Sequence, residues 1–200
     1  MGLSLPSSEI AAGQDADAPL ATAAAALGSA GFAPTLGLRW GTTDRIEPGL
    51  RIGAGEIVAG PRIAVLRPDD GWDLTVAIAG SLAFLAPDAG REDIEVEGFV
   101  RGGGAVGVTV GRTWSDFLSV WLAARGEVGG YDLDATLDGK DASHAGLASR
   151  FGGSFGVRVG FRRFFAGIEL SVARASIGTQ TGTIEGLVLY PAFGVSYETR

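Results

Sequence analysis

Apolar and polar residues alternate with a period of two from residue 33 to the end of the chain. Near the middle, for example, Trp72 and Leu74 alternate with Asp73 and Thr75. This pattern predicts half-buried β-strands, because a helix would repeat its apolar positions every third and fourth residue. Nine strands are predicted in this way, over residues 33–40, 45–54, 57–66, 72–84, 94–111, 117–128, 147–161, 164–175 and 186–199.

The two faces of these predicted strands differ in size as well as in polarity. One face is bulky and apolar, whereas the other consists of Gly, Ala, Ser and Thr interrupted by Arg and Glu. A narrow lumen has room only for small side chains, and a lipid-facing surface favours large apolar ones. The pattern therefore favours an all-β fold, a closed antiparallel transmembrane β-barrel. A soluble, calycin-like ligand-binding barrel stays an alternative, because its strands would alternate too.

The connections between the predicted strands also alternate, in length. Short connections are expected over residues 41–44, 67–71, 112–115 and 162–163, and longer ones over 86–93, 129–146 and 175–185, with 53–56 as a short exception. Short periplasmic turns and longer extracellular loops are typical of outer-membrane barrels. Aromatic residues gather at the short-turn end and are predicted to lie at the membrane interface. They are Trp40, Trp72, Trp114, Phe161, Phe164, Phe165 and Tyr197.

The direction of the predicted strands bears on their number. Bacterial barrels have even strand numbers, and nine strands would leave the barrel open. Residues 18–28 are therefore the predicted tenth strand, and eight strands is the alternative if two segments, including 45–54 and 57–66, are miscounted. The predicted organisation is a flexible lead-in over residues 1–17, which are small, acidic and unpatterned, followed by a barrel over 18–200.

Composition narrows the class of protein further. The chain has 200 residues, 33 of them glycine and none cysteine, and its net charge is −7. Its mean hydropathy of +0.25 is high for a soluble domain, yet no apolar stretch reaches the roughly 18 residues of a transmembrane helix. Without cysteine there are no disulfides and no thiolate metal sites. The acidic balance, with no basic cluster, argues against a nucleic-acid partner.

The first residues bear on export. Residues 1–19 lack the basic start and compact apolar core of a secretory signal. An outer-membrane location therefore leads us to expect that a natural signal has been removed, or that the gene starts further upstream.

Two segments resemble a known class of proteins. The run Leu36-Gly37-Leu38-Arg39-Trp40-Gly41-Thr42-Thr43-Asp44-Arg45, continued as far as Arg51, is similar to the repeated R-Y-G-L-T-D-R hairpin of small outer-membrane β-barrel proteins of Gram-negative bacteria. The closing run Phe193-Gly194-Val195-Ser196-Tyr197 resembles the carboxy-terminal strand read by the barrel-assembly machinery, although this chain continues with Glu198-Thr199-Arg200. The resemblance implies a fold, an outer-membrane location, contact with outer-membrane lipids and help from that machinery during insertion. It implies no catalytic residues.

Charged residues on the small face are predicted to point into the lumen. They are Arg39, Arg51, Arg62, Arg101, Arg125, Arg150 and Arg158, with Glu47, Asp73, Glu95, Glu97, Glu127, Glu169 and Glu198. Their balance of sign favours pairing, because unpaired charge in a narrow lumen is costly and Arg binds carboxylates in a fork geometry. A salt-bridged, occluded lumen in a structural or surface protein is therefore predicted. A porin-like narrow pore or transporter for small or hydrophobic solutes is the alternative.

No enzymatic site is predicted, and no metal or other cofactor. His144, the single histidine, is expected in the 129–146 loop beside Ser143, where neighbouring side chains diverge and no third catalytic group is evident. The acidic residues of that loop, Asp132, Asp134, Asp138 and Asp141, miss the spacing of a calcium loop. The glycines at 102–104 lie within a predicted strand and have no following helix, so they are not a phosphate-binding loop.

Overall fold

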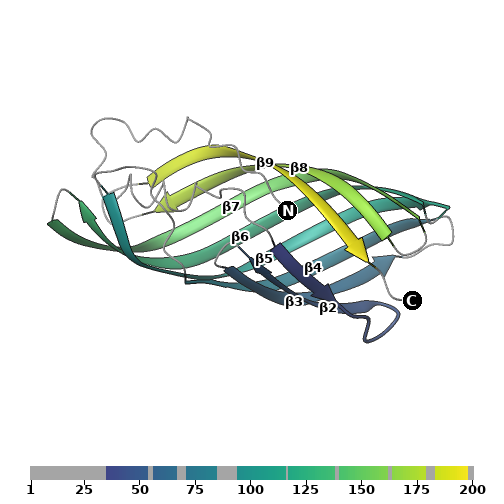
Figure 1. Cartoon of the computed structure of the whole chain (residues 1–200), viewed down its shortest axis with the longest axis horizontal. Coiled ribbons are helices and arrows are strands. Elements are labelled where there is room, and N and C mark those ends of the chain that lie inside the picture. The colour runs from purple at the N-terminus through teal and green to yellow at the C-terminus, as the bar shows by residue number, and fades with distance from the viewer. Residues whose placement is uncertain are drawn as a thin grey trace.

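A single antiparallel sheet makes up the described part of the molecule. The structure, a computed structural model, describes residues 35–53, 56–66, 71–84, 94–115, 117–137, 140–161, 164–178 and 183–197. Its strands are β1 (Thr35–Arg39), β2 (Ile46–Gly53), β3 (Glu56–Leu66), β4 (Trp72–Ala83), β5 (Ile94–Trp114), β6 (Leu118–Leu137), β7 (Lys140–Phe161), β8 (Phe164–Gly178) and β9 (Thr183–Tyr197). They pair in chain order, each with its neighbour in the sequence. Figure 1 shows the sheet curled along its length.

The prediction of an all-β antiparallel fold is confirmed. Each of the nine strands expected from the alternation is present at its predicted place. The eight-strand alternative is wrong, because β2 and β3 are separate strands that pair from Ile46↔Ile63 to Gly53↔Glu56. Period-two alternation located these strands because one face is uniformly bulky from strand to strand.

The expected 129–146 loop is not a loop. Strands β6 and β7 continue through it, with register pairs from Gly129↔Ala148 to Leu137↔Lys140. Only residues 138 and 139 separate the two strands, and Asp-Gly is a favoured two-residue hairpin sequence. The expected 175–185 loop is shortened in the same way, because β8 ends at Gly178 and β9 begins at Thr183.

We call the two ends of the sheet the turn rim and the loop rim. The turn rim has the connections 40–45, 67–71, 115–117 and 162–163, and the loop rim has 54–55, 84–93, 138–139 and 179–182. Strands β5, β6 and β7, with 21, 20 and 22 residues, are the longest. Their extra residues lie at the loop rim, beyond the ends of β3 and β4.

The described sheet is open, which differs from the closed barrel expected from the sequence. Its order ends at β1 on one side and β9 on the other, with no ladder between these two strands among the described residues. Both edge strands run toward the turn rim, since an odd number of antiparallel strands leaves the first and last parallel. The predicted tenth strand, 18–28, and the lead-in, 1–17, lie outside the described residues. No helix in the described part of the chain has the length and apolar character needed to cross a membrane.

Exposure alternates along the strands and distinguishes two faces. We call the face that carries Ile78, Leu122 and Leu170 the outer face, and the face that carries Glu127 and Glu169 the inner face. Along most of the described strands, outer-face residues are exposed and their inner-face neighbours are half-buried or buried. Among the described residues, 33 large hydrophobic side chains are exposed and only eight hydrophobic residues are buried. Most of the bulky apolar side chains of this sheet therefore face outward, and most inner-face residues are small.

The turn between β3 and β4 depends on Gly71. Its φ of +83° lies in the left-handed region that favours glycine. Its carbonyl accepts a hydrogen bond of 2.9 Å from the Thr113 backbone N–H, which ties the turn to β5. A Cβ at this position would also collide with the Thr113 carbonyl oxygen.

We predict that Gly71→Ala lowers the free energy of unfolding by about 1–3 kcal/mol, because it combines an unfavourable φ with a backbone collision. Gly102→Ala is the matched control, since nothing lies within 4 Å of a Cβ placed there. The control is expected to change stability by less than about 0.5 kcal/mol. Urea titration of the refolded proteins measures both values, and equal losses would contradict the role of Gly71.

Candidate functional site: the inner-face charge network

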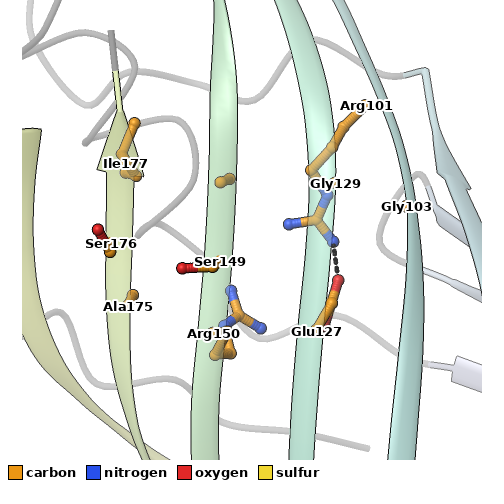
Figure 2. Close-up of a pocket in the computed structure, with 10 residues that line it drawn as sticks. Arg101, Gly103, Glu127, Gly129, Ser149, Arg150, Ala175, Ser176 and Ile177 are labelled. Carbon is orange, nitrogen blue, oxygen red and sulfur yellow. Dashed lines mark hydrogen bonds and ion pairs between the residues drawn. The ribbon is translucent and has the colours of Figure 1, made fainter.

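A chain of charged side chains crosses the inner face, with Arg101 of β5 at its centre. One Arg101 nitrogen, Nη2, lies 2.8 Å from Glu56 Oε1 and 2.9 Å from Glu127 Oε1. Figure 2 shows the Arg101–Glu127 contact between neighbouring strands. The side chains of Arg101 and Glu127 are only 15% and 12% exposed. A guanidinium that bridges two carboxylates in this way is held in one position.

Two further arginines extend this chain at either end. Arg51 of β2 lies 3.7 Å from Glu56, and Arg125 of β6 lies 3.8 Å from Glu127. The charges therefore alternate in sign from β2 to β6 and link four strands across the inner face. We call these five residues the central network.

Arg101 can reach Glu56 because the strand between them carries small inner-face residues. In the register, Ala83 of β4 lies opposite Glu56 of β3 on one side and opposite Arg101 of β5 on the other. The alanine side chain is too short to block the space above it. The small inner-face residues noted in the sequence thus give an arginine room to cross a whole strand.

Glu56 was not among the residues expected in the lumen, although it accepts a hydrogen bond from Arg101. The sequence analysis placed it in the short 53–56 connection, whereas β3 begins at this residue. The signal was available: Glu56 has the same parity as Val58, Gly60 and Arg62, which all lie on the inner face. Extending the alternation back by one residue would have found it.

Other expected lumen charges lie elsewhere on the inner face. Arg62 and Asp73 approach to 3.7 Å near the turn rim. Glu169 accepts hydrogen bonds of 3.1 Å from the Trp121 indole and 3.1 Å from the Ser171 hydroxyl. The Arg158 guanidinium carbon lies 4.4 Å from the centre of the Phe165 ring.

The remaining expected residues fall into three groups. The first group lies on the inner face. Arg39 is in β1 and Glu47 is in β2. Arg150 is in β7, opposite Glu127 of β6. Glu97 is exposed beside a β-bulge between Val96 and Gly98 and accepts a 2.6 Å hydrogen bond from Thr136, so it lies apart from the central network. The side chain of Glu95, and Glu198, are outside what the structure describes.

A small hollow adjoins the central network. It is lined by Arg101, Glu127 and Arg150 together with small residues, as Figure 2 shows, and its empty space of about 440 Å³ includes open solvent. Glycines 103 and 129 form part of its wall. The hollow therefore has charged and backbone groups on one side and the apolar residue Ile177 on the other.

An apolar cluster fills the inner face on the loop-rim side of the hollow. Its members are Ala83, Phe99, Tyr131, Leu133 and Ile177, with Ala148 packed against them. Leu133 is 1% exposed. This cluster is not predicted from the sequence, because Tyr131 and Leu133 fall within the expected 129–146 loop. Once β6 is extended, the two residues continue the parity of Glu127 and Gly129.

The expected interface aromatics divide between the two faces. Exposed side chains are found for Trp40, Trp72, Trp114, Phe161, Phe164 and Tyr197. Phe164 and Tyr197 are register partners whose ring centres are 5.1 Å apart. Phe165 is different: it is 7% exposed and lies over Gly160 on the inner face, so its assignment to the outer rim is wrong. Adjacent residues of a strand point to opposite faces, so Phe164 and Phe165 cannot share one.

Apart from Asp138, which lies outside the described residues, the residues considered for chemistry lie in strands. His144 is in β7, opposite Leu133 of β6. Asp132 and Asp134 are in β6 and Asp141 is in β7, all exposed. Within the described ranges, no group of three or more potential metal-ligating side chains comes together. The glycines at 102–104 lie within β5.

Comparison with known proteins found no matching family, no matching curated protein and no matching solved structure.

We predict that Arg101→Ala lowers the free energy of unfolding by about 3 kcal/mol or more, because it leaves the carboxylates of Glu56 and Glu127 without their bridging cation. Arg174→Ala is the control. It removes an arginine paired with Glu185 at an exposed position, where an ion pair contributes less than about 1 kcal/mol. Urea titration compares the two, and a loss at Arg101 no larger than at Arg174 would show that the central network does not stabilise the sheet.

Proposed function

We propose that this protein is an integral outer-membrane β-barrel of Gram-negative bacteria, with a structural or surface role and an occluded lumen. The observation that carries the proposal is an uncharged apolar band around the outer face. Outer-face positions carry no charged side chain over residues 118–130 of β6, 164–172 of β8 and 187–197 of β9. They carry none over 72–82 of β4 either.

Charges return on the outer face where this band ends. On the loop-rim side the first of them are Asp132, Arg174 and Glu185. The band is thus 9 residues long on β8 and 13 on β6, counted from the ranges above. A tilted strand needs about 9–11 residues to cross the hydrocarbon core of a bilayer. The length of the band therefore supports a membrane-spanning sheet.

The polarity of the two faces argues against the soluble alternative. A soluble ligand-binding barrel places bulky apolar residues inside and polar ones outside, and this sheet has the reverse arrangement. Water-soluble monomers rarely expose contiguous apolar patches above a few hundred Å². Lipid chains on the outer face would remove this surface from water.

Membrane insertion also requires that the edges of the sheet be paired, because unpaired backbone groups in lipid cost several kcal/mol each. We propose that residues 18–28 supply a tenth strand between β9 and β1. A strand that runs toward the loop rim would be antiparallel to both edges. This closure agrees with the even strand numbers of bacterial barrels.

The inner face supports an occluded lumen rather than an open pore. The central network spans it from β2 to β6, and the apolar cluster around Leu133 fills it toward the loop rim. Paired charges and packed apolar side chains occupy the inner face along these strands. We therefore propose a structural or surface role rather than transport through the lumen.

We predict that Leu122→Arg destabilises the protein in lipid vesicles by about 2–4 kcal/mol, because Leu122 lies within the apolar band, where arginine must enter hydrocarbon. Leu122 is 59% exposed, so in a water-soluble protein the same change would shift stability by less than about 0.5 kcal/mol. Ser143→Arg, at an exposed position beyond the band, is the matched control. Vesicle flotation and urea titration measure insertion and stability. A Leu122→Arg variant as stable as the control, in a protein that stays soluble without detergent, would rule out the membrane proposal.

We expect purified protein in planar bilayers to show no stable conductance at any salt concentration, because the lumen is filled. A Leu133→Ala, Arg101→Ala double variant removes side chains that fill the proposed lumen. It is expected to produce measurable current if it still inserts. Wild-type channels of defined conductance would instead support the narrow pore and exclude an occluded lumen.

A further inference from the structure

Of the strand residues that the structure describes, Arg112 is the one charged residue on the outer face near the turn rim. It lies in register with Trp72 on β4 and with Val120 on β6. The described residues beside it on the outer face are therefore apolar or aromatic, and none of them is a carboxylate. A cation in such surroundings calls for an explanation, because burial without a partner is costly.

Two tryptophans hold the Arg112 guanidinium. Its central carbon lies 5.4 Å from the ring centre of Trp72 and 5.2 Å from that of Trp114, both within cation–π range. Its Nε is buried and has no hydrogen-bond partner. No acceptor among the described residues hydrogen-bonds to this side chain, although a guanidinium has five N–H groups to donate. The ring contacts fix the cation but do not satisfy its donors.

The missing acceptor is best matched by phosphate. A planar guanidinium binds phosphate oxygens through paired N–H bonds, more selectively than an ammonium does. Tryptophan side chains favour the headgroup level of a bilayer, and the long stem of arginine lets its charge reach that level from the apolar band. Charge on the outer face is also asymmetric. At the loop rim it is mainly acidic, with Asp132, Asp134 and Asp141 exposed.

We propose that Trp72, Arg112 and Trp114 form a binding site for the phosphate of an anionic phospholipid in the leaflet at the turn rim. Arg112 donates the hydrogen bonds, and the two indole rings position it. An anionic headgroup is favoured over a zwitterionic one because it carries no cation to compete with the arginine. This proposal rests on the proposed membrane function. It identifies the class of lipid that the protein binds at the turn rim.

The test compares the protein in phosphatidylcholine vesicles with and without phosphatidylglycerol. Phosphatidylglycerol is expected to raise the urea midpoint of the wild type, and native mass spectrometry is expected to detect retained phosphatidylglycerol. In Arg112→Gln the midpoint increase is expected to vanish, and lipid retention to weaken about tenfold, as for one lost charge-assisted bond. Arg112→Lys is expected to keep part of both effects. Arg174→Gln, at the opposite rim, is the control and is expected to keep both in full.

Each other outcome counts against the proposal. A full phosphatidylglycerol response in Arg112→Gln would overturn it, and so would an equal loss in Arg174→Gln. If Arg112→Gln does not fold, a full response in Arg112→Lys overturns the proposed fork geometry. Inorganic phosphate that stabilises the protein equally in detergent would assign the site to the free ion instead of a lipid. Vesicle flotation distinguishes failure of the membrane function from failure of the lipid site. If the wild type does not insert, the membrane function is refuted. If it inserts but its response to phosphatidylglycerol does not depend on Arg112, only the lipid site is refuted.

Discussion

The curled sheet depends on how little volume its inner face has to hold. Curvature brings inner-face side chains together, and two large aromatic rings near the turn rim lie over residues without a side chain. Trp121 lies over Gly156, and Phe165 lies over Gly160 in the same manner. A Cβ at either glycine would collide with the aromatic ring. At these two positions glycine is thus a packing requirement, since each pair fills one inner-face position with one ring. Most of the large apolar residues lie on the outer face, where they are exposed.

Charge is accommodated on another part of the inner face, from β2 to β6. Arg101 crosses above Ala83 to reach Glu56, and its other partner, Glu127, comes from β6. This arrangement connects strands that share no hydrogen-bonded ladder, because β3 and β5 are separated by β4. Backbone pairing joins each strand only to its neighbours. The central network adds a tie at longer range, and the low exposure of Arg101 and Glu127 protects that tie from competition with water.

The sequence alone was enough to place all nine described strands and most of the inner-face charges, because a period of two determines both the strand and the face of each residue. It failed where other constraints operate. The β6–β7 hairpin is not predicted, because the outer-face charges Asp132 and Asp134 interrupt the apolar alternation there, and the turn signal is only the Asp-Gly dipeptide at 138–139. Glu56 was missed by one residue at a strand end. The ion-pair partners within the central network could not be derived. Arg101 contacts Glu56 across β4 only because of the register between β3, β4 and β5, and alternation does not specify that register.

The strict chain order of the sheet has a kinetic consequence. Every ladder, from β1–β2 to β8–β9, joins strands that are adjacent in the sequence, so each can form as a hairpin with a short connection. Such local contacts carry a small loop-closure entropy and form early. Closure of the proposed barrel would be the exception, because it would join segments separated by almost the whole chain. Assembly of a closed barrel is therefore expected to proceed as a rapid growth of the sheet followed by one slow step, in which the two edges are joined.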